Sequence, residues 1–405
     1  MMQALAHAIG VTLLLVQTVA LLVLLARLLP GRSRRAPVKP VLTPRRDTSV
    51  SVIVATLNEA HRIGPCLDGL VRQIDPLLEI LVVDSRSTDG TREIVSAYGA
   101  RDPRIRLITD DPLPAGWVGK VWALETGLRH ARGVWVLGID ADTLPAPGLI
   151  GAVVQGVEQD RLDVASFGPR FVGQCAGERW VQPAMLTTLV YRCGAAGAAQ
   201  APPDRVLANG QCFLARRELL VRHGGYAPAR ASFSDDVTLA RHLAARGARV
   251  GFLDGSHVIG VTSYSSLREM WHEWGRSFDL KDATSPRRRW FDVALVWSVQ
   301  ALPLPVLLML GVIALFAAGG PVDTGLPTVT GSMLLEALAL VNGSALLVRL
   351  LLLAALRGSY ADRGIPFWLS PLADIPAAWR LTLSMLQVPR SWRGRDYAGF
   401  AVLER

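Results

Sequence analysis

Two pairs of acidic residues are the side chains of this chain best suited to chemistry. Asp140 and Asp142, separated by one residue, end the apolar run 134–139. Carboxylates at the end of a buried strand supply hard oxygen ligands in the crevice where open α/β sheets bind their substrates. The first pair therefore suits a divalent cation and a phosphate, although a solvated loop with two acids would have the same pattern.

The second pair, Asp235 and Asp236, follows Ser234 and opens the helix-like segment 237–243. Serine is a good N-cap, and acids in the first turn complement the positive end of a helix, so a purely structural role is one interpretation. The other interpretation is that the pair forms a second acidic site. Lys120 follows a Gly-Trp-Val-Gly turn and would approach a phosphate if that turn borders the crevice.

Polar side chains also follow the first two apolar runs of the middle region. Thr56, Asn58 and Glu59 end the first run, and Asp84 ends the second. Acids and amides at the carboxyl edge of neighbouring strands can hydrogen-bond a base and a ribose. The following Asp89-Gly90-Thr91 also has the composition of a turn that leads into a helix.

The elements that must position these residues alternate between strand and helix. Strands are predicted at 51–56, 79–83, 105–108, 134–139 and 249–253, and helices at 62–74, 91–98, 120–131 and 147–159. This alternation predicts an α/β fold with a mostly parallel sheet. The Gly-x-Gly-x-x-Gly fingerprint is missing and 116–121 lacks P-loop spacing, which disfavours a nicotinamide dehydrogenase and a P-loop NTPase.

Composition points to a chain that is partly in lipid. Of the 405 residues, 50% are hydrophobic, and the net charge is +9. The basic residues gather beside apolar segments, at 32–46 and 287–289, which is typical of juxtamembrane sequence, and no nucleic-acid-binding signature is present. The four cysteines are scattered without a Cys-x-x-Cys pair, so neither structural zinc nor a disulfide framework is expected, as suits a reducing cytosol.

Three apolar segments, 8–29, 291–318 and 332–356, are long enough to span a bilayer. The first lacks a basic n-region and a cleavage site, so it is expected to be an uncleaved anchor. The loop 319–331 has no Lys or Arg, whereas basic residues flank the outer ends of the last two segments. This charge asymmetry predicts a multi-pass inner-membrane protein with its amino terminus outside and its middle region in the cytoplasm.

Glu336, Asn342 and Arg349 lie within the third segment, where they should face protein, water or the interface. The segment 365–387 mixes Trp and Leu with charged residues and three prolines, which predicts a helix lying in the membrane interface. We therefore expect five regions. These are an anchor (1–30), a basic linker (31–48), a soluble α/β domain (49–285), a transmembrane pair (286–357) and an interfacial carboxyl-terminal region (358–405).

Five ordered motifs between 49 and 282 resemble family 2 glycosyltransferases with the GT-A fold. They are Thr56-Leu57-Asn58-Glu59, Val82-Val83-Asp84 with Ser87-Thr88-Asp89-Gly90-Thr91, Gly116-Trp117-x-Gly119-Lys120-x-x-Ala123-Leu124, Asp140-Ala141-Asp142 and Ser234-Asp235-Asp236. The resemblance implies an inverting transfer of a sugar from a nucleotide-sugar, usually UDP-linked, with Mg²⁺ or Mn²⁺ as cofactor.

The resemblance also implies a role for each matching position. On the donor side, Thr56, Asn58, Glu59 and Asp84 would bind the nucleoside, Lys120 would approach the diphosphate, and Asp142 would reach the metal with Asp140 beside it. On the acceptor side, Asp236 would be the general base next to Asp235, and Asn209-Gly210-Gln211-Cys212 resembles the acceptor-side loop.

The family's Gln-x-x-Arg-Trp signature is degraded here to Glu273-Trp274-Gly275-Arg276-Ser277. Arg276 would still contact the diphosphate, while Trp274 or Trp271 would replace the missing tryptophan at the acceptor. Tryptophans on an interfacial helix could equally be membrane anchors.

The segments 235–243 and 274–282 look like those of bacterial carotenoid glycosyltransferases. This implies transfer of glucose from UDP-glucose to a membrane lipid, most like a hydroxycarotenoid. Hopanoid, ceramide-type and diacylglycerol glycosyltransferases are the alternatives, followed by a processive polysaccharide synthase and a non-catalytic membrane scaffold. Nucleic acid is not expected as a partner, and the sequence indicates no oligomeric state.

Overall fold

A twisted seven-stranded sheet lies at the centre of residues 50–254 in the computed structural model. The structure describes residues 2–43, 45–198, 202–262, 264–318, 330–387, 391–392 and 395–396. The strand order of the sheet is β3-β2-β1-β4-β8-β6-β9. All neighbours are parallel except β8, which runs antiparallel to both β4 and β6. The bounds are β1 Val50–Thr56, β2 Leu77–Asp84, β3 Ile105–Thr109, β4 Trp135–Asp140, β6 Val164–Gly168, β8 Cys212–Arg216 and β9 Val250–Asp254.

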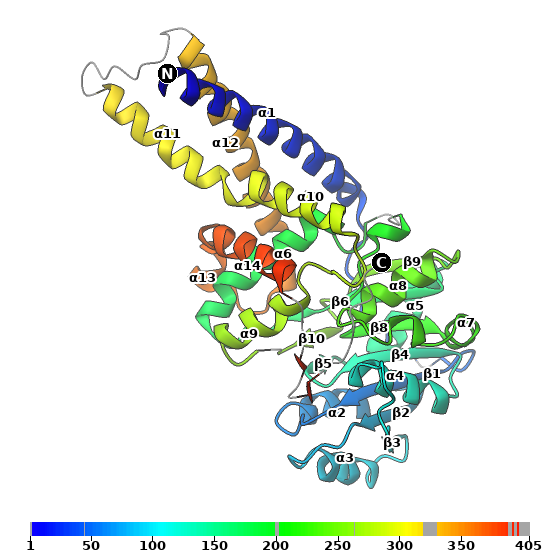
Figure 1. Ribbon diagram of the computed structural model, residues 1–405. Helices are drawn as coiled ribbons and strands as arrows, with labels where there is room; N and C mark the ends of the chain where they lie inside the picture. The colour runs from blue at the N-terminus through cyan, green and yellow to red at the C-terminus, as the bar shows by residue number, and fades with distance from the viewer. Residues whose placement is uncertain are drawn as a thin grey trace.

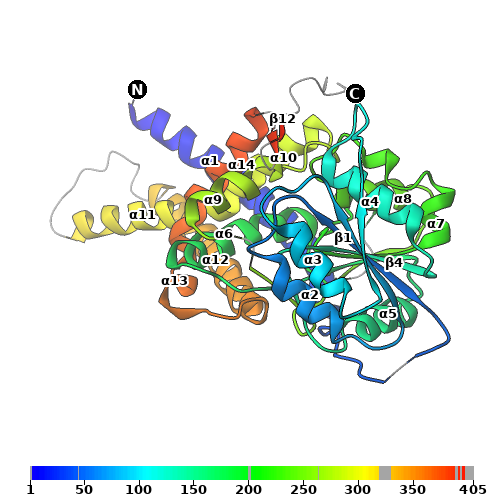
Figure 2. The same ribbon diagram turned by 90° about the horizontal axis from the view of Figure 1, so that it is seen from below.

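Helices cover both faces of this sheet, which explains why its strands are continuous apolar runs. On β1, Val52 and Val54 pack against α2 (Ile63–Val71), α3 (Thr91–Gly99) and α5 (Leu149–Gln159), whereas Ile53 packs toward α4 (Gly119–His130) and α8 (Asp235–Ala244). Figure 2 shows α2, α3 and α5 on one side of the sheet and α4, α7 (Arg217–Arg222) and α8 on the other.

The five predicted strands and four predicted helices are confirmed, with boundary shifts of a few residues. The helix predicted after Ser234 is also present, as α8. The strands β6 and β8 and the elements described next were not predicted. A second, three-stranded sheet has the order β5-β10-β7 and is built from Thr143–Pro145, Ile259–Val261 and Arg170–Phe171. The helices α6 (Ala176–Cys193) and α9 (Leu267–Glu273) and the short helices η2 (Pro203–Arg205), η3 (Ala227–Ala229) and η4 (Trp274–Ser277) complete this part of the chain.

Long apolar helices extend away from the sheet. Two of them, α1 (Met2–Leu28) and α12 (Thr330–Leu356), are long and apolar enough to cross a membrane. The segment 291–318, predicted as a third span, is not one straight helix. The helix α10 (Pro286–Val296), the π-turn η5 (Trp297–Ala301) and α11 (Pro303–Ala318) form a pair bent by 42°, which is long and apolar enough to span a membrane only if both parts are counted together. The bend lies where the π-turn meets Pro303, whose ring cannot continue a regular helix. Figure 1 shows α1, α11 and α12 side by side.

Glu336, Asn342 and Arg349 were predicted to face away from lipid. Two of these three residues, Asn342 and Arg349, contact other parts of the protein. Asn342 on α12 exchanges two amide hydrogen bonds of 2.8 Å with Gln17 on α1. Arg349 donates to both carboxylate oxygens of Asp374 at 3.0 Å. Glu336 is exposed. The loop predicted at 319–331 lies outside the described residues up to 329.

The predicted interfacial segment is helical but broken. It consists of α13 (Gly364–Trp368), η7 (Ser370–Ala373) and α14 (Asp374–Leu386), which pack against α6. Its outward face exposes Ile365, Trp368, Leu369, Leu372, Ile375, Trp379 and Leu386. Figures 1 and 2 show α6, α9 and α13 between the long helices and the sheet. The turns η1 (Leu29–Ser33) and η6 (Arg357–Ser359) end α1 and α12, and β11 (Ser391–Trp392) pairs with β12 (Arg395–Asp396).

Candidate active site

The first acidic pair lies at the end of β4, where a lysine neutralises one of its members. Lys120 in the first turn of α4 places its Nζ 2.7 Å from Oδ1 of Asp140. Burial lowers the pKa of Lys120, but the carboxylates of Asp140 and Asp235 outweigh it and hold this pKa above its usual range. Lys120 is therefore a fixed positive charge at the end of the strand.

Asp142 is the other member of the pair and has a free ligand atom. Its Oδ1 is buried without a hydrogen-bond partner among the described residues. Burial and the charge of Asp140 raise the pKa of Asp142 to about 6, although the positive charge of Arg62 lowers it in part. Arg62 itself donates to Glu59 at 2.9 Å, so Glu59 belongs to the same electrostatic neighbourhood.

Asp140 and Asp142 fit a divalent-cation site that has few protein ligands. The described residues contain no group of three or more His, Cys, Asp or Glu side chains that could hold a metal ion. However, Mg²⁺ and similar ions in nucleotide sites take few protein carboxylates and complete their shell with phosphate oxygens and water. The unpartnered oxygen of Asp142 with Asp140 beside it is such a partial donor set.

The second acidic pair opens α8 close to the lysine. Asp236 accepts a hydrogen bond of 2.6 Å from the backbone N–H of Gly210 through Oδ2, and one of 2.8 Å from its neighbour Val237 through Oδ1. A side chain at Gly210 would come within 3.1 Å of Lys120 Nζ, so glycine permits this close approach. Burial and the charge of Asp235 raise the pKa of Asp236 to about 7. The pKa of Asp235 is raised as well, mainly by burial.

Ser234 holds the N-cap position, as predicted, but the predicted capping contact is absent. Its side chain makes no capping hydrogen bond, and its Oγ is buried without a partner among the described residues. The hydroxyl lies beside the two acids because the 232–234 turn is fixed by Ser232, whose Oγ accepts from the Ser234 N–H at 3.0 Å.

Lys120, Asp140, Asp235 and Asp236 line one cavity of ≈ 320 Å³, whereas Asp142 does not line it. The lining includes a polar group of residues, which we call the polar half, namely Lys120, Asp140, Gly210, Gln211, Asp235 and Asp236. It also includes an apolar group, which we call the apolar half, namely Phe171, Leu186, Leu189, Trp274, Phe278 and Leu356. Since Leu356 ends α12, the cavity connects the carboxyl edge of the sheet with the end of an apolar helix long enough to span a membrane.

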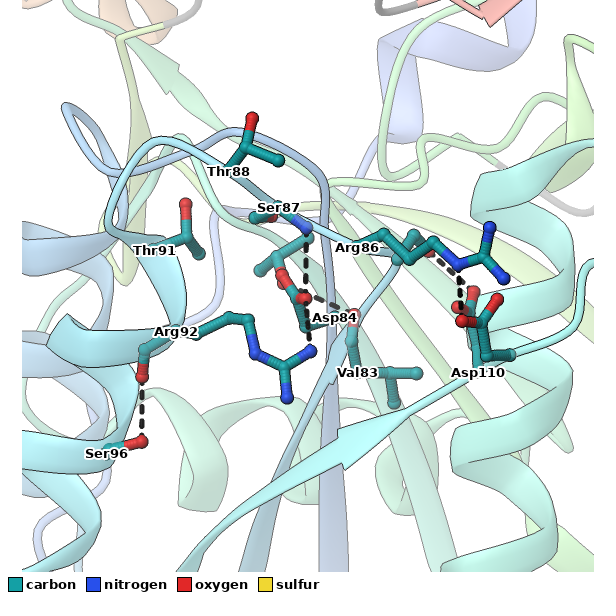
Figure 3. Close-up of polar contacts among 12 residues, drawn as sticks. Val83, Asp84, Arg86, Ser87, Thr88, Thr91, Arg92, Ser96 and Asp110 are labelled. Carbon is teal, nitrogen blue, oxygen red and sulfur yellow. Dashed lines mark hydrogen bonds and ion pairs between the residues drawn. The ribbon is translucent and has the colours of Figure 1, made fainter.

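The four residues predicted to bind the nucleoside form the next part of the sheet edge. Asp84 is fully buried, and Figure 3 shows it accepting from the Ser87 N–H and the Arg92 guanidinium, at 3.1 and 3.3 Å. Thr56 contacts the same carboxylate at 3.4 Å, and Asn58 accepts from the Thr88 N–H at 2.9 Å. These contacts tie together the loops after β1 and β2.

The register of the strands places the predicted nucleoside residues level with Asp140. Thr56 pairs with Asp84 across β1 and β2, and Ala55 pairs with Asp140 across β1 and β4. The ends of β2, β1 and β4 are therefore level. The predicted nucleoside residues do not line the cavity, and their role as nucleoside ligands stays a prediction.

Two further predicted residues come from the short helix η4. Trp274 lines the cavity, with its ring 6.4 Å from Phe171 and 5.9 Å from Phe278. Trp271, the alternative, lies under the guanidinium of Arg380 instead. The backbone of Arg276 belongs to η4, but its side chain lies outside the part of the structure that is described.

The main part of the site that sequence reasoning missed is the wall formed by α6. Gln182, Leu186 and Leu189 are three to four residues apart and line the cavity. This spacing is visible in the sequence, but α6 is buried along most of its length and contains Pro183, so no polar face marks it as a helix.

The chain is similar in sequence to known glycosyltransferases. Residues 51–224 match the family model "Glycosyl transferase family 2", and the region has a GT-A α/β fold. The chain is 31% identical over 137 residues to the "Uncharacterized glycosyltransferase EpsJ" of Bacillus subtilis, covering 34% of this chain and 38% of that protein. It is 33% identical over 121 residues to a dolichyl-phosphate beta-glucosyltransferase of Trichomonas vaginalis, covering 28% of this chain and 34% of that protein.

One solved structure resembles almost the whole chain. It is the mannosyltransferase PcManGT from Pyrobaculum calidifontis in complex with GDP-Man and Mn²⁺. The TM-score is 0.54 at 24% identity, over 93% of this chain and 98% of that one. By contrast, the chain spans little more than a third of the length of the two curated relatives, 38% and 34%.

Proposed function

We propose that this protein is an inverting glycosyltransferase that moves glucose from UDP-glucose to a hydroxyl group of a membrane lipid, a hydroxycarotenoid, at the cytoplasmic face of the inner membrane. The observation that carries the proposal is the two-sided cavity. Its polar half holds a lysine and acids suited to a sugar diphosphate, and its apolar half runs to the end of α12.

On the donor side, Asp142 and Asp140 would hold Mg²⁺ or Mn²⁺ together with the diphosphate of the nucleotide-sugar. Such a cation supplies neutralisation of the charge that develops on the departing diphosphate. Lys120, 2.7 Å from Asp140, is a second positive charge at this position and needs no reorganisation during the reaction. Glu59 and Asp84, on the neighbouring strand ends, are our candidates for the nucleoside side.

On the acceptor side, Asp236 is the proposed general base. A bond forms between the acceptor oxygen and the anomeric carbon while the bond from that carbon to the diphosphate breaks, and the hydroxyl proton passes to Asp236. The Gly210 N–H holds one carboxylate oxygen of Asp236 in place, and the charge of Asp235 makes it a stronger proton acceptor.

A lipid acceptor accounts for the other half of the cavity. Phe171, Leu186 and Leu189 offer no hydrogen bonds to a soluble sugar or phosphate. A hydrocarbon body would fill this half and would reach it from the bilayer along α12. The exposed apolar face of α13, η7 and α14 would rest in the interface beside it.

Membranes containing the full chain, incubated with radiolabelled UDP-glucose, Mn²⁺ and a panel of hydroxycarotenoids, hopanoids, ceramide and diacylglycerol, test the proposal. We expect a glucosylated carotenoid.

Asp236→Asn should depress turnover by roughly 10²-fold or more with nucleotide binding retained, whereas Asp142→Ala should weaken metal-dependent donor binding. Label in another lipid alone would reject the carotenoid, label in polymer would indicate a polysaccharide synthase, and absence of UDP release would indicate a scaffold.

A further inference from the structure

The helix α6 places one polar residue in the apolar half of the cavity. Four of its residues line the cavity, at positions 182, 186, 189 and 190, which is the spacing of a single helix face. Three are apolar, namely Leu186, Leu189 and Val190. The fourth, Gln182, is only 2% exposed.

Gln182 differs from the other buried glutamines of the described chain. Gln17, Gln73 and Gln300 each donate two hydrogen bonds through Nε2. The Oε1 of Gln182 is buried without a partner, as is the Oε1 of Gln300. The difference lies at Nε2, because the Nε2 of Gln182 donates to no described residue. A buried amide without partners is costly, and such groups in native proteins call for an explanation.

A packing role does not explain Gln182. Its neighbours on the same helix belong to apolar clusters, with Val181, Ala184 and Met185 in one and Leu186 in another. A leucine or methionine would fill the same position without leaving an amide unsatisfied. The amide does have a position where it could be satisfied, since the residue lines the cavity that also contains Asp236.

We propose that the apolar half of the cavity is the acceptor subsite and that the carboxamide of Gln182 hydrogen-bonds a second polar group of the acceptor. This inference rests on the proposed function in taking the polar half as the reaction site. The acceptor is then a lipid with two oxygen functions, one hydroxyl that reacts at Asp236 and a second oxygen, set back along the chain, that meets Gln182. A simple long-chain alcohol supplies only the first.

The test measures binding of defined alcohols to the full chain in detergent with UDP present. The probes are hexadecan-1-ol and a series of hexadecanediols whose second hydroxyl moves along the chain, and dissociation constants come from calorimetry. The best diol should bind the wild-type chain about 10-fold more tightly than hexadecan-1-ol, the value of one well-made hydrogen bond. In Gln182→Met, which keeps the length of the side chain, the ratio should fall to about one.

Two results would overturn the inference. The first is that the wild-type chain binds no diol more tightly than hexadecan-1-ol. A wild-type chain that binds neither the diols nor hexadecan-1-ol counts as the same result. The other is a Gln182→Met chain that keeps the wild-type ratio. Met185→Leu, on α6 but packed in the core, is the matched control and should preserve the ratio. Affinity for UDP, measured in the same samples, reports separately on the proposed function.

Discussion

Asp236 is the residue whose protonation should set the pH dependence of turnover. Burial and the charge of Asp235 raise its pKa to about 7, and only the deprotonated form accepts a proton. We therefore predict that kcat/KM for the donor falls about 10-fold per pH unit as the pH drops below about 7. Protonation of Asp142, whose pKa is about 6, should add a second loss at lower pH, because the neutral acid is a poor metal ligand.

Asp235→Asn separates the two effects. Removing the neighbouring negative charge lowers the pKa of Asp236, so the upper inflection should move to lower pH while the limb from Asp142 remains. Initial rates of UDP release across a pH series measure both. A flat profile from about pH 5 to pH 8, or an inflection that moves upward in Asp235→Asn, would contradict the assignment of Asp236 as the base.

Residue types at strand ends could be predicted from the sequence because their chemistry is local. Asp140 and Asp142 were identified from their spacing, and Asp236 from the family resemblance. The structure places Asp140 and Asp236 in the lining of one cavity, which Asp142 does not line. Partners of these residues could not be predicted, since they come from distant segments. The N–H of Gly210 that holds Asp236 is 26 residues away. The unsatisfied amide of Gln182 could not be foreseen either, because a missing contact has no sequence pattern.

At the level of elements, a buried ion pair joins the long helix α12 to the wall of the cavity. Arg349 on α12 and Asp374 at the start of α14 are 1% and 5% exposed. Gln300 in the π-turn η5 donates to Asp374 and to the carbonyl of Ala184 on α6, both at 2.9 Å. The pair therefore links α12, α14, η5 and α6.

Breaking this pair should destabilise the protein and loosen the acceptor side of the cavity. Arg349→Met leaves the carboxylate of Asp374 buried without its counter-charge, which typically costs about 3–5 kcal/mol. The double variant Arg349→Met/Asp374→Leu removes both charges and should recover most of the loss. Thermal unfolding in detergent measures this, and the single variant should raise KM for the acceptor more than for the donor. If the double variant is no more stable than the single one, the buried charge is not the cause.

The elements of the sheet were easier to predict than those between the sheet and the long helices. A strand buried on both faces is an uninterrupted apolar run, as in 134–139, and is recognisable alone. In contrast, α6 is enclosed on nearly all sides, and the π-turn η5 before Pro303 packs against α1 and α14. Such features are decided by tertiary packing rather than by local sequence.

For the whole molecule, the arrangement of the long helices predicts an orientation in the membrane. The basic residues that follow α1 should stay in the cytoplasm with the sheet, so the amino-terminal end of α1 should face outward. α12 contacts both α1 and α11, and its end at Leu356 meets the cavity. Its other end, near Met333, should then lie on the same side as Ala4.

Single cysteines introduced into a chain whose four native cysteines are replaced by alanine or serine measure this orientation. Ala4→Cys and Met333→Cys should react with a membrane-impermeant maleimide in intact cells after the outer membrane is made permeable. Asp47→Cys, exposed in the linker before β1, should react only after the inner membrane is opened. Labelling of Asp47→Cys in intact cells would put the cavity on the side without nucleotide-sugars, and the proposed reaction could not then take place.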